Sequence, residues 1–285
     1  MIFKGIIVGN FITFVLLFMV SLFLGRAFCG WVCPGAGIQE WCFTVNDKKV
    51  LNGVKSLSLT NFDSIKYPAE EVLTPIAEKY PQKIISFFYK RFLIQKKKKQ
   101  EDHYDAIPYR LHQLNKPLSE NAEIVLPEIL KWFKKKDTLL HWEGSHLIEA
   151  IFPVFNKSLD EELIKLIKSK NEKNIRIVFN ILRTYKGEEF LHNICKELIK
   201  EYPKNEDYHE KIFIILSQMG VVSGEYGFVK GFEKKKEEVQ CWKEDKNKAI
   251  QLFVKKYEEY LDKRISYEKK QADEDLELRK RQFDN

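Results

Sequence analysis

The sequence predicts an all-α fold, in which one N-terminal transmembrane helix is followed by an irregular α-solenoid. From Gly5 to Gly25 there is no charged residue. After residue 55 the chain becomes rich in Lys, Glu, Leu, Ile and Phe, and its apolar residues recur at helical spacing. Thirteen Gly and nine Pro in 285 residues are few, and no pair of apolar segments is joined by a hairpin turn. Together these features favour helices over strands.

The overall charge points to a membrane surface more than to nucleic acid. Lys and Arg total 48 against 41 Asp and Glu, which gives a net charge of +7. This mild excess is spread along the chain, whereas a nucleic-acid groove concentrates positive charge. We therefore expect the membrane and proteins as partners, and no nucleic acid.

Residues 1–26 form the predicted transmembrane helix. The 21 residues from Gly5 to Gly25, at about 1.5 Å each, match a hydrocarbon core of about 30 Å. A cleaved signal peptide is the competing interpretation, but its apolar region is usually about 7–15 residues long and ends in small residues. Here the apolar segment continues into Arg26-Ala27-Phe28, and the bulky Phe28 disfavours a lipoprotein-type cleavage before Cys29. We expect the segment to be retained.

Basic residues near this segment predict its direction. Lys4 precedes it, whereas Arg26, Lys48, Lys49 and Lys55 follow it. Cytoplasmic flanks carry the excess of Lys and Arg. The sequence therefore predicts a single-pass protein of the cytoplasmic (inner) membrane with its C-terminal domain in the cytoplasm, where thiols stay reduced.

A cysteine-rich motif over residues 27–55 holds the candidate site. Three of the five cysteines are Cys29, Cys33 and Cys42, while Cys195 and Cys241 stand alone in helical contexts. An odd number of cysteines, crowded in this way, is typical of a metal or cluster site and not of a disulfide framework.

Thiolates are the usual ligands of iron–sulfur clusters, and Gly30 permits the tight turn that such a loop needs. Zinc is the competing metal, but structural zinc favours two-residue gaps and a second Cys or His pair, which does not follow here. A four-iron cluster takes four ligands. The fourth would come from Cys195, Cys241, a second subunit or a non-protein group.

The motif carries a family resemblance. Gly25-Arg26-Ala27-Phe28-Cys29-Gly30-Trp31-Val32-Cys33-Pro34-Gly35, continuing through Gln39-Glu40, Cys42 and Asn46-Asp47-Lys48-Lys49, resembles the membrane-bound 4Fe-4S ferredoxin-like proteins that supply electrons to nitrate and nitrous oxide reductases. The resemblance implies a 4Fe-4S cluster, with Cys29 and Cys33 as ligands and Cys42 as a further one. It covers about the first 55 residues. Such proteins continue with further spans and cysteine groups, which this sequence lacks.

Residues 56–66 are the expected joint, and residues 67–285 the expected helical-repeat domain. Pro68 begins a predicted helix that runs to Tyr80, and Pro81 begins another that ends in the run Lys96–Lys99. That run is either a solvated helix end or a contact for phosphate or anionic lipid. Ser158 is the expected N-cap of a later helix, because Glu161 completes a capping box.

Apolar residues at helical spacing predict the helices that follow. These are Leu126, Ile129, Leu130 and Phe133; Leu147, Ile148, Ile151 and Phe155; Leu163, Ile164 and Ile167; Ile175, Val178, Phe179 and Leu182; Phe190, Leu191, Ile194 and Leu198; and Ile212, Ile215, Leu216 and Met219. Short turns such as Lys186-Gly187 separate them, which favours antiparallel stacking. Residues 142–281 also resemble, more loosely, the helical-repeat tails of bacterial multidomain proteins, so we expect a HEAT-like solenoid.

Catalytic candidates in this domain are weak. His141 and His146 are five residues apart, which does not place them on one helix face for a metal. His192 and Cys195 could meet on a helix, but Cys195 lies among apolar residues and is expected in the core. Ser223-Gly224-Glu225 lacks phosphate-loop spacing and is expected to form a turn. From Asp262 onward we expect a solvent-facing capping helix or a frayed tail.

Two main functional hypotheses follow, and in neither do we expect catalytic activity of the chain's own. In the first, a membrane-anchored 4Fe-4S protein transfers electrons and binds a redox partner through the solenoid surface. In the second, a membrane-tethered helical-repeat scaffold binds protein and carries a vestigial cysteine motif that arose by gene fusion. A non-functional junction of two gene fragments is a third possibility.

Overall fold

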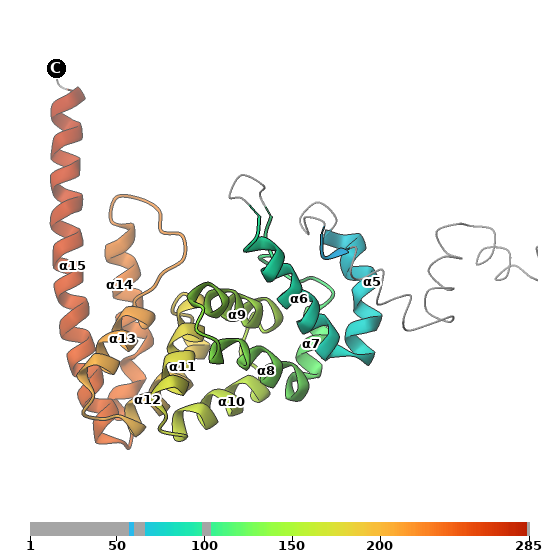
Figure 1. Cartoon of the computed structure of the whole chain (residues 1–285). Coiled ribbons are helices and arrows are strands. Elements are labelled where there is room, and N and C mark those ends of the chain that lie inside the picture. Colours follow the sequence, from blue (N-terminus) through green and yellow to red (C-terminus); the bar gives the residue numbers. More distant parts are fainter. Residues whose placement is uncertain (1–56, 60–65, 99–103, 284–285) are drawn as a thin grey trace, which may run out of the picture. The chain divides into compact units, whose positions relative to one another are not determined.

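The computed structural model describes residues 57–59, 66–98 and 104–283, and these fall into two compact units, residues 1–60 and 61–285. The regular structure of the described residues is entirely helical, which confirms the all-α prediction for that part of the chain. Figure 1 follows the helices in chain order. They are α5 (Lys66–Lys79), α6 (Pro81–Gln95), α7 (Asn115–Glu120), α8 (Ala122–Leu130), η3 (Trp132–Lys134), α9 (Thr138–Ile151), α10 (Lys157–Lys168), α11 (Glu172–Thr184), η4 (Glu189–Leu191), α12 (His192–Glu201), α13 (Glu206–Leu216), α14 (Gly227–Glu238), η5 (Gln240–Glu244) and α15 (Lys248–Phe283).

The predicted transmembrane helix, residues 1–26, lies outside the described residues, as does most of the expected joint at residues 56–66. Within the part that is described, no helix combines the length and the apolar character needed to cross a bilayer.

Helix starts in the large unit follow simple capping chemistry. Helix α6 begins at Pro81, as predicted, because proline is favoured at the first helical position. The side chains of Asp137, Asn156 and Asn205 each accept a hydrogen bond from the backbone N–H three residues later, and so cap α9, α10 and α13. Helix α5 begins at Lys66, two residues before the predicted Pro68.

The predicted N-cap at Ser158 is wrong. Helix α10 begins at Lys157, and the Oδ1 of Asn156 accepts a hydrogen bond from the backbone N–H of Leu159 at 2.9 Å. Ser158 is therefore already inside the first turn. Asn and Ser are about equally favourable N-caps, so residue preference alone does not distinguish position 156 from position 158.

The apolar residues expected in the core are largely buried there. In α11, Ile175, Val178, Phe179 and Leu182 are all buried. In α10, Leu163 and Ile167 are buried, whereas Ile164 is half-buried. The main contacts join helices one to three places apart along the chain, for example α9 with α11, α10 with α12, and α12 with α15. This neighbour-to-neighbour packing does not by itself establish a repeat, so the HEAT-like solenoid stays a prediction.

The turn after α11 depends on a glycine. Lys186 and Gly187 both have positive φ angles, of 53° and 72°. A Cβ on Gly187 would lie 2.7 Å from the carbonyl oxygen of Gln218 and 2.8 Å from that of Ile215. The predicted Lys186-Gly187 turn is therefore confirmed, and the close approach of the end of α13 leaves no room for a side chain at position 187.

A buried carboxylate holds the start of α7. Glu70 is fully buried, and its Oε2 accepts hydrogen bonds from the backbone N–H groups of Gln113 and Leu114, at 2.5 and 3.2 Å, and of the preceding His112. These donors belong to the last two residues before the N-cap of α7 and to the N-cap residue, Leu114. Glu70 lies on α5, so the interaction joins residues 42 to 44 positions apart.

Helices α14 and α15 form an antiparallel pair. Lys236 lies 2.6 Å from the carboxylate of Asp262, and further along the pair Arg279 lies 3.2 Å from that of Glu225. Helix α15 is continuous through 36 residues to Phe283. The segment from Asp262 onward is thus helical and mostly exposed, as expected of a solvent-facing capping helix.

Candidate functional site

The predicted ligands Cys29, Cys33 and Cys42 lie outside the described residues. Their role as cluster or metal ligands therefore stays a prediction. The structure does place the other two cysteines, and it shows that their environments are opposite.

Cys195 is a core thiol. It lies on α12, fully buried beside Ile194 and Leu198, which confirms the expectation from the sequence. Burial raises the pKa of the Cys195 thiol to about 12, because the apolar surroundings disfavour the thiolate. A nucleophile or a metal ligand must be a thiolate, so Cys195 is unsuited to both roles. Cys241, on η5, is exposed.

His192 belongs to the same packed region. Its ring contacts the Trp242 ring edge to face, with centroids 5.0 Å apart. Burial, followed by the nearby positive charge of Lys235, lowers the pKa of His192 to about 4. The imidazole is therefore neutral at physiological pH and packs as an aromatic ring.

The two other histidines considered from the sequence have local partners. The Nε2 of His141 lies 2.7 Å from the carbonyl oxygen of Lys135, and its ring stacks on Phe133. The Nδ1 of His146 lies 3.3 Å from the carboxylate of Glu149. Across the ranges that the structure describes, no group of three or more His, Cys, Asp or Glu side chains could hold a metal ion.

A buried acid, Glu143, was not singled out by the sequence. It lies on α9 and is 2% exposed. Burial raises its pKa to about 7, although a hydrogen bond from Gln95 and the charge of His146 oppose this shift. The charge of Asp105 reinforces it. Nothing in the local sequence around Glu143 indicates burial, because the covering side chains come from other segments.

A cavity lies where the turn between α12 and α13 meets the first turns of α15. Its volume is about 890 Å³, and its lining mixes charged and apolar side chains: Glu201, Tyr202, Pro203, Lys204, Asn205, Glu206, His209, Ala249, Leu252, Phe253 and Lys256. Leu252 is 57% exposed, and Lys256 pairs with Glu206 at 3.1 Å.

A second cavity of about 440 Å³ lies beside the turn at Gly187 and the segment that follows α13. The ammonium of Lys235 at its edge hydrogen-bonds the carbonyl of Gly187 at 2.5 Å and pairs with Glu238 at 2.9 Å. These contacts are internal to the fold. They account for Lys235 and Glu238 as structural connections. The nearby Ser223-Gly224-Glu225 lies in the connection between α13 and α14, as predicted.

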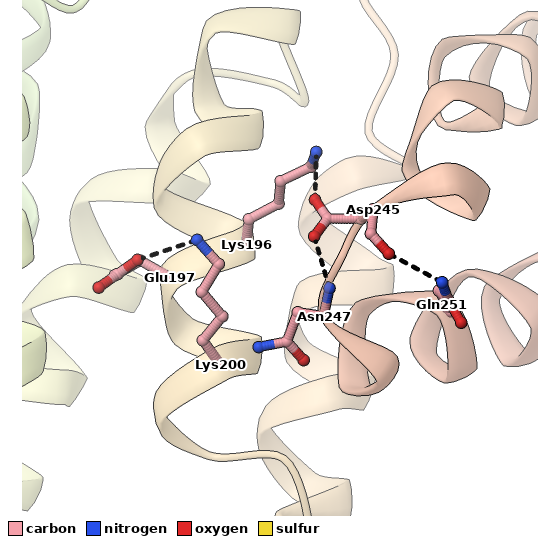
Figure 2. A network of polar contacts seen from close by, with 6 residues as sticks. All are labelled: Lys196, Glu197, Lys200, Asp245, Asn247 and Gln251. Carbon is pink, nitrogen blue, oxygen red and sulfur yellow. Dashed lines mark hydrogen bonds and ion pairs between the residues drawn. The ribbon is translucent and has the colours of Figure 1, made fainter.

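Figure 2 shows a polar network that joins α12 to the turn between η5 and α15. Lys196 pairs with Asp245 at 3.0 Å, and Asp245 also accepts a hydrogen bond from the backbone N–H of Asn247 at 3.0 Å. On the neighbouring turn of α12, Lys200 lies 3.4 Å from Glu197. The network consists of ion pairs and turn hydrogen bonds, which is the pattern of a structural connection.

The comparisons with known proteins concern the N-terminal segment. No curated protein and no solved structure matches the chain. A family model described as a 4Fe-4S binding domain matches residues 7–51, a segment that contains Cys29, Cys33 and Cys42. The chain is therefore similar, over these residues, to 4Fe-4S binding domains, and this similarity supports an iron–sulfur cluster and electron transfer.

Proposed function

We propose that this protein is a membrane-anchored 4Fe-4S protein that transfers single electrons. The observation that carries the proposal is the match of residues 7–51 to a 4Fe-4S binding domain. Within that segment, Cys29 and Cys33 would hold the cluster and Cys42 would be a further ligand. The donor set fits, because thiolates are the usual protein ligands of such clusters. When bound, the cluster would take up and release one electron.

The burial of the two cysteines in the helical unit bears on which group could be the fourth ligand of the cluster. Cys195 is fully buried with its pKa raised to about 12, so it would have to leave the core and lose a proton to bind iron. Cys241 is exposed, so it would not have to leave the core. We therefore propose Cys241, a second subunit or a non-protein ligand as the source of the fourth bond.

We further propose that residues 1–26 span the cytoplasmic membrane once, with the helical domain in the cytoplasm. The uncharged segment from Gly5 to Gly25 and the basic residues after it support this orientation. The helical domain would bind the redox partner, and we propose the cavity lined by Leu252 and Lys256 as the surface for this contact.

Anaerobic purification tests the cluster. The full chain should contain iron and acid-labile sulfide and show the broad visible absorbance of an iron–sulfur cluster. Cys29→Ala and Cys33→Ala should lose both, whereas the matched Cys195→Ala should keep both. Cys241→Ala decides whether the exposed thiol is the fourth ligand. Colourless, iron-free protein from a fully anaerobic preparation would contradict the proposal.

One observation favours the scaffold as a second candidate. The family match ends at residue 51, so it does not extend into the second compact unit, residues 61–285, which carries the open cavity. In that case, deletion of residues 1–55 should leave a helical domain that is soluble and unfolds cooperatively. Aggregation of the deletion variant would count against a domain that works independently of the cysteine motif.

A further inference from the structure

Two lysine runs that are far apart in the sequence lie together in the structure. One run follows the end of α6, and the other surrounds η3, just before α9. The Nζ of Lys96 lies 2.6 Å from the Oδ2 of Asp137, although the two residues are 41 positions apart. The ammonium of Lys135 also hydrogen-bonds the hydroxyl of Tyr89 on α6. These two contacts tie the second run to the end of α6.

The resulting patch, which we call the lysine surface, is strongly basic. Its members are all exposed: Lys96, Lys97, Lys98, Lys131, Lys134, Lys135 and Lys136. Among the described residues, two carboxylates pair with it: Glu128 lies 2.5 Å from Lys131, and Asp137 lies 2.6 Å from Lys96. Within the part of the chain that the structure describes, the lysines of this surface therefore outnumber the carboxylates paired with them, and none of its basic residues is an arginine.

Exposed apolar side chains lie close to these lysines along the chain. Leu93 is 41% exposed and lies one helical turn before Lys97. Leu139 and Trp142 are 42% and 55% exposed, and they share one face of the first turns of α9, directly after Lys136. Exposed tryptophan and lysine side chains are both typical of segments that reach the interface of a membrane.

We propose that the lysine surface binds the anionic headgroups of a lipid bilayer, with Leu93, Leu139 and Trp142 entering the interfacial layer. Clustered lysines are attracted to anionic headgroups, and the attraction acts within about 10 Å of the membrane at moderate salt. This surface is less suited to nucleic-acid recognition, which favours the planar guanidinium of arginine and does not require exposed aliphatic side chains. The proposal does not depend on the iron–sulfur cluster, and it concerns a surface outside the predicted span.

The test uses the full chain held in nanodiscs of neutral phosphatidylcholine, so that any N-terminal span is already embedded in a bilayer. Vesicles are then added and co-flotation is measured. Vesicles with about a third phosphatidylserine should carry the protein at low salt and release it at high salt, whereas pure phosphatidylcholine vesicles should not bind it. Because any N-terminal span is embedded in the nanodisc, binding to the added vesicles does not depend on whether residues 1–26 span a membrane.

A charge-removing variant and a matched control locate the interaction. Lys97→Gln, Lys134→Gln and Lys136→Gln combined should lower co-flotation about tenfold or more, since each lysine near an anionic surface contributes to binding. Lys173→Gln, Lys230→Gln and Lys263→Gln combined remove the same charge from exposed positions elsewhere and should change co-flotation less than about twofold. Trp142→Ser should weaken binding while leaving its salt dependence in place.

Three outcomes would overturn the proposal. They are equal binding to neutral and anionic vesicles, equal losses in the two triple variants, and binding of a short RNA duplex without any binding of anionic vesicles.

Discussion

The Nζ of Lys196 on α12 lies 3.0 Å from the Oδ2 of Asp245, and this ion pair joins segments 49 residues apart (Figure 2). The same aspartate accepts a hydrogen bond from Asn247, and its carbonyl oxygen accepts one from the Gln251 side chain at 2.8 Å. The Lys196 ammonium also lies 5.0 Å from the centre of the Trp242 ring. Asp245 thus shapes the turn into α15 and fastens that turn to α12.

Asp245→Asn should destabilise the helical unit by about 1 kcal/mol at neutral pH, because the pair is partly exposed and screened by water. Hydrogen bonds from Asn247 and Lys196 hold the pKa of Asp245 below its usual value. The stabilisation is therefore present above about pH 4, and it is lost as the pH falls through the lowered pKa. Thermal unfolding followed by circular dichroism should show a difference between the proteins at pH 7 that disappears at strongly acidic pH. Lys200→Gln, which removes a neighbouring lysine, should change stability by less than about 0.5 kcal/mol.

Glu143→Gln should have the opposite pH dependence. The pKa of Glu143 rises from 4.5 to about 7 on folding, so the folded protein holds a proton that the unfolded chain releases. The stability of the wild type therefore falls as the pH rises from about 4.5 to 7, by on the order of 3 kcal/mol. The variant should be more stable than the wild type at pH 8 and similar to it at pH 4.5. Glu210→Gln, at an exposed position of α13, is the control; an equal gain there would show that the effect is one of net charge.

Gly187→Ala should destabilise the protein more than Gly224→Ala. Both glycines have positive φ angles, of 72° and 81°, so both variants carry backbone strain of roughly 1 kcal/mol. Only at Gly187 would the new Cβ also meet backbone oxygens, the nearest at 2.7 Å, whereas at Gly224 there is no atom within 4 Å. Because carbonyl groups of a packed helix end cannot move aside cheaply, the Gly187 variant should lose several kcal/mol in all. Similar unfolding midpoints for the two variants would contradict the close approach.

Alkylation should distinguish the two cysteines of the helical unit by the rates at which their thiols react. In the native protein at pH 8, a maleimide should modify the exposed Cys241 within minutes and leave Cys195 unmodified, because the latter is buried with its pKa at about 12. Peptide mass mapping gives the modification of each site. Under denaturing conditions both should react. Fast labelling of Cys195 in the folded protein would show that α12 does not shield it.

The prediction of the helices succeeded where burial follows local spacing. Four apolar residues of α11 recur at the helical period and are buried: Ile175, Val178, Phe179 and Leu182. Their burial could be predicted because an apolar helix face packs against whichever helix lies next to it. The predicted N-cap of α10 was wrong, because Asn156 and Ser158 are both favourable N-cap residues and the sequence does not rank them. The burial of Glu143 had no local signal, since its cover comes from other segments.

The sequence by itself determined the helical class of the large unit, the turn at Lys186-Gly187, the core position of Cys195 and the similarity of residues 7–51 to 4Fe-4S binding domains. Each of these depends on residues that are neighbours along the chain. Tertiary structure decided the rest: it brought the end of α6 next to η3, formed the cavity between the α12–α13 turn and α15, and paired Lys196 with Asp245. These features join residues about 40 to 50 positions apart, and only the packing of whole helices brings such residues into contact.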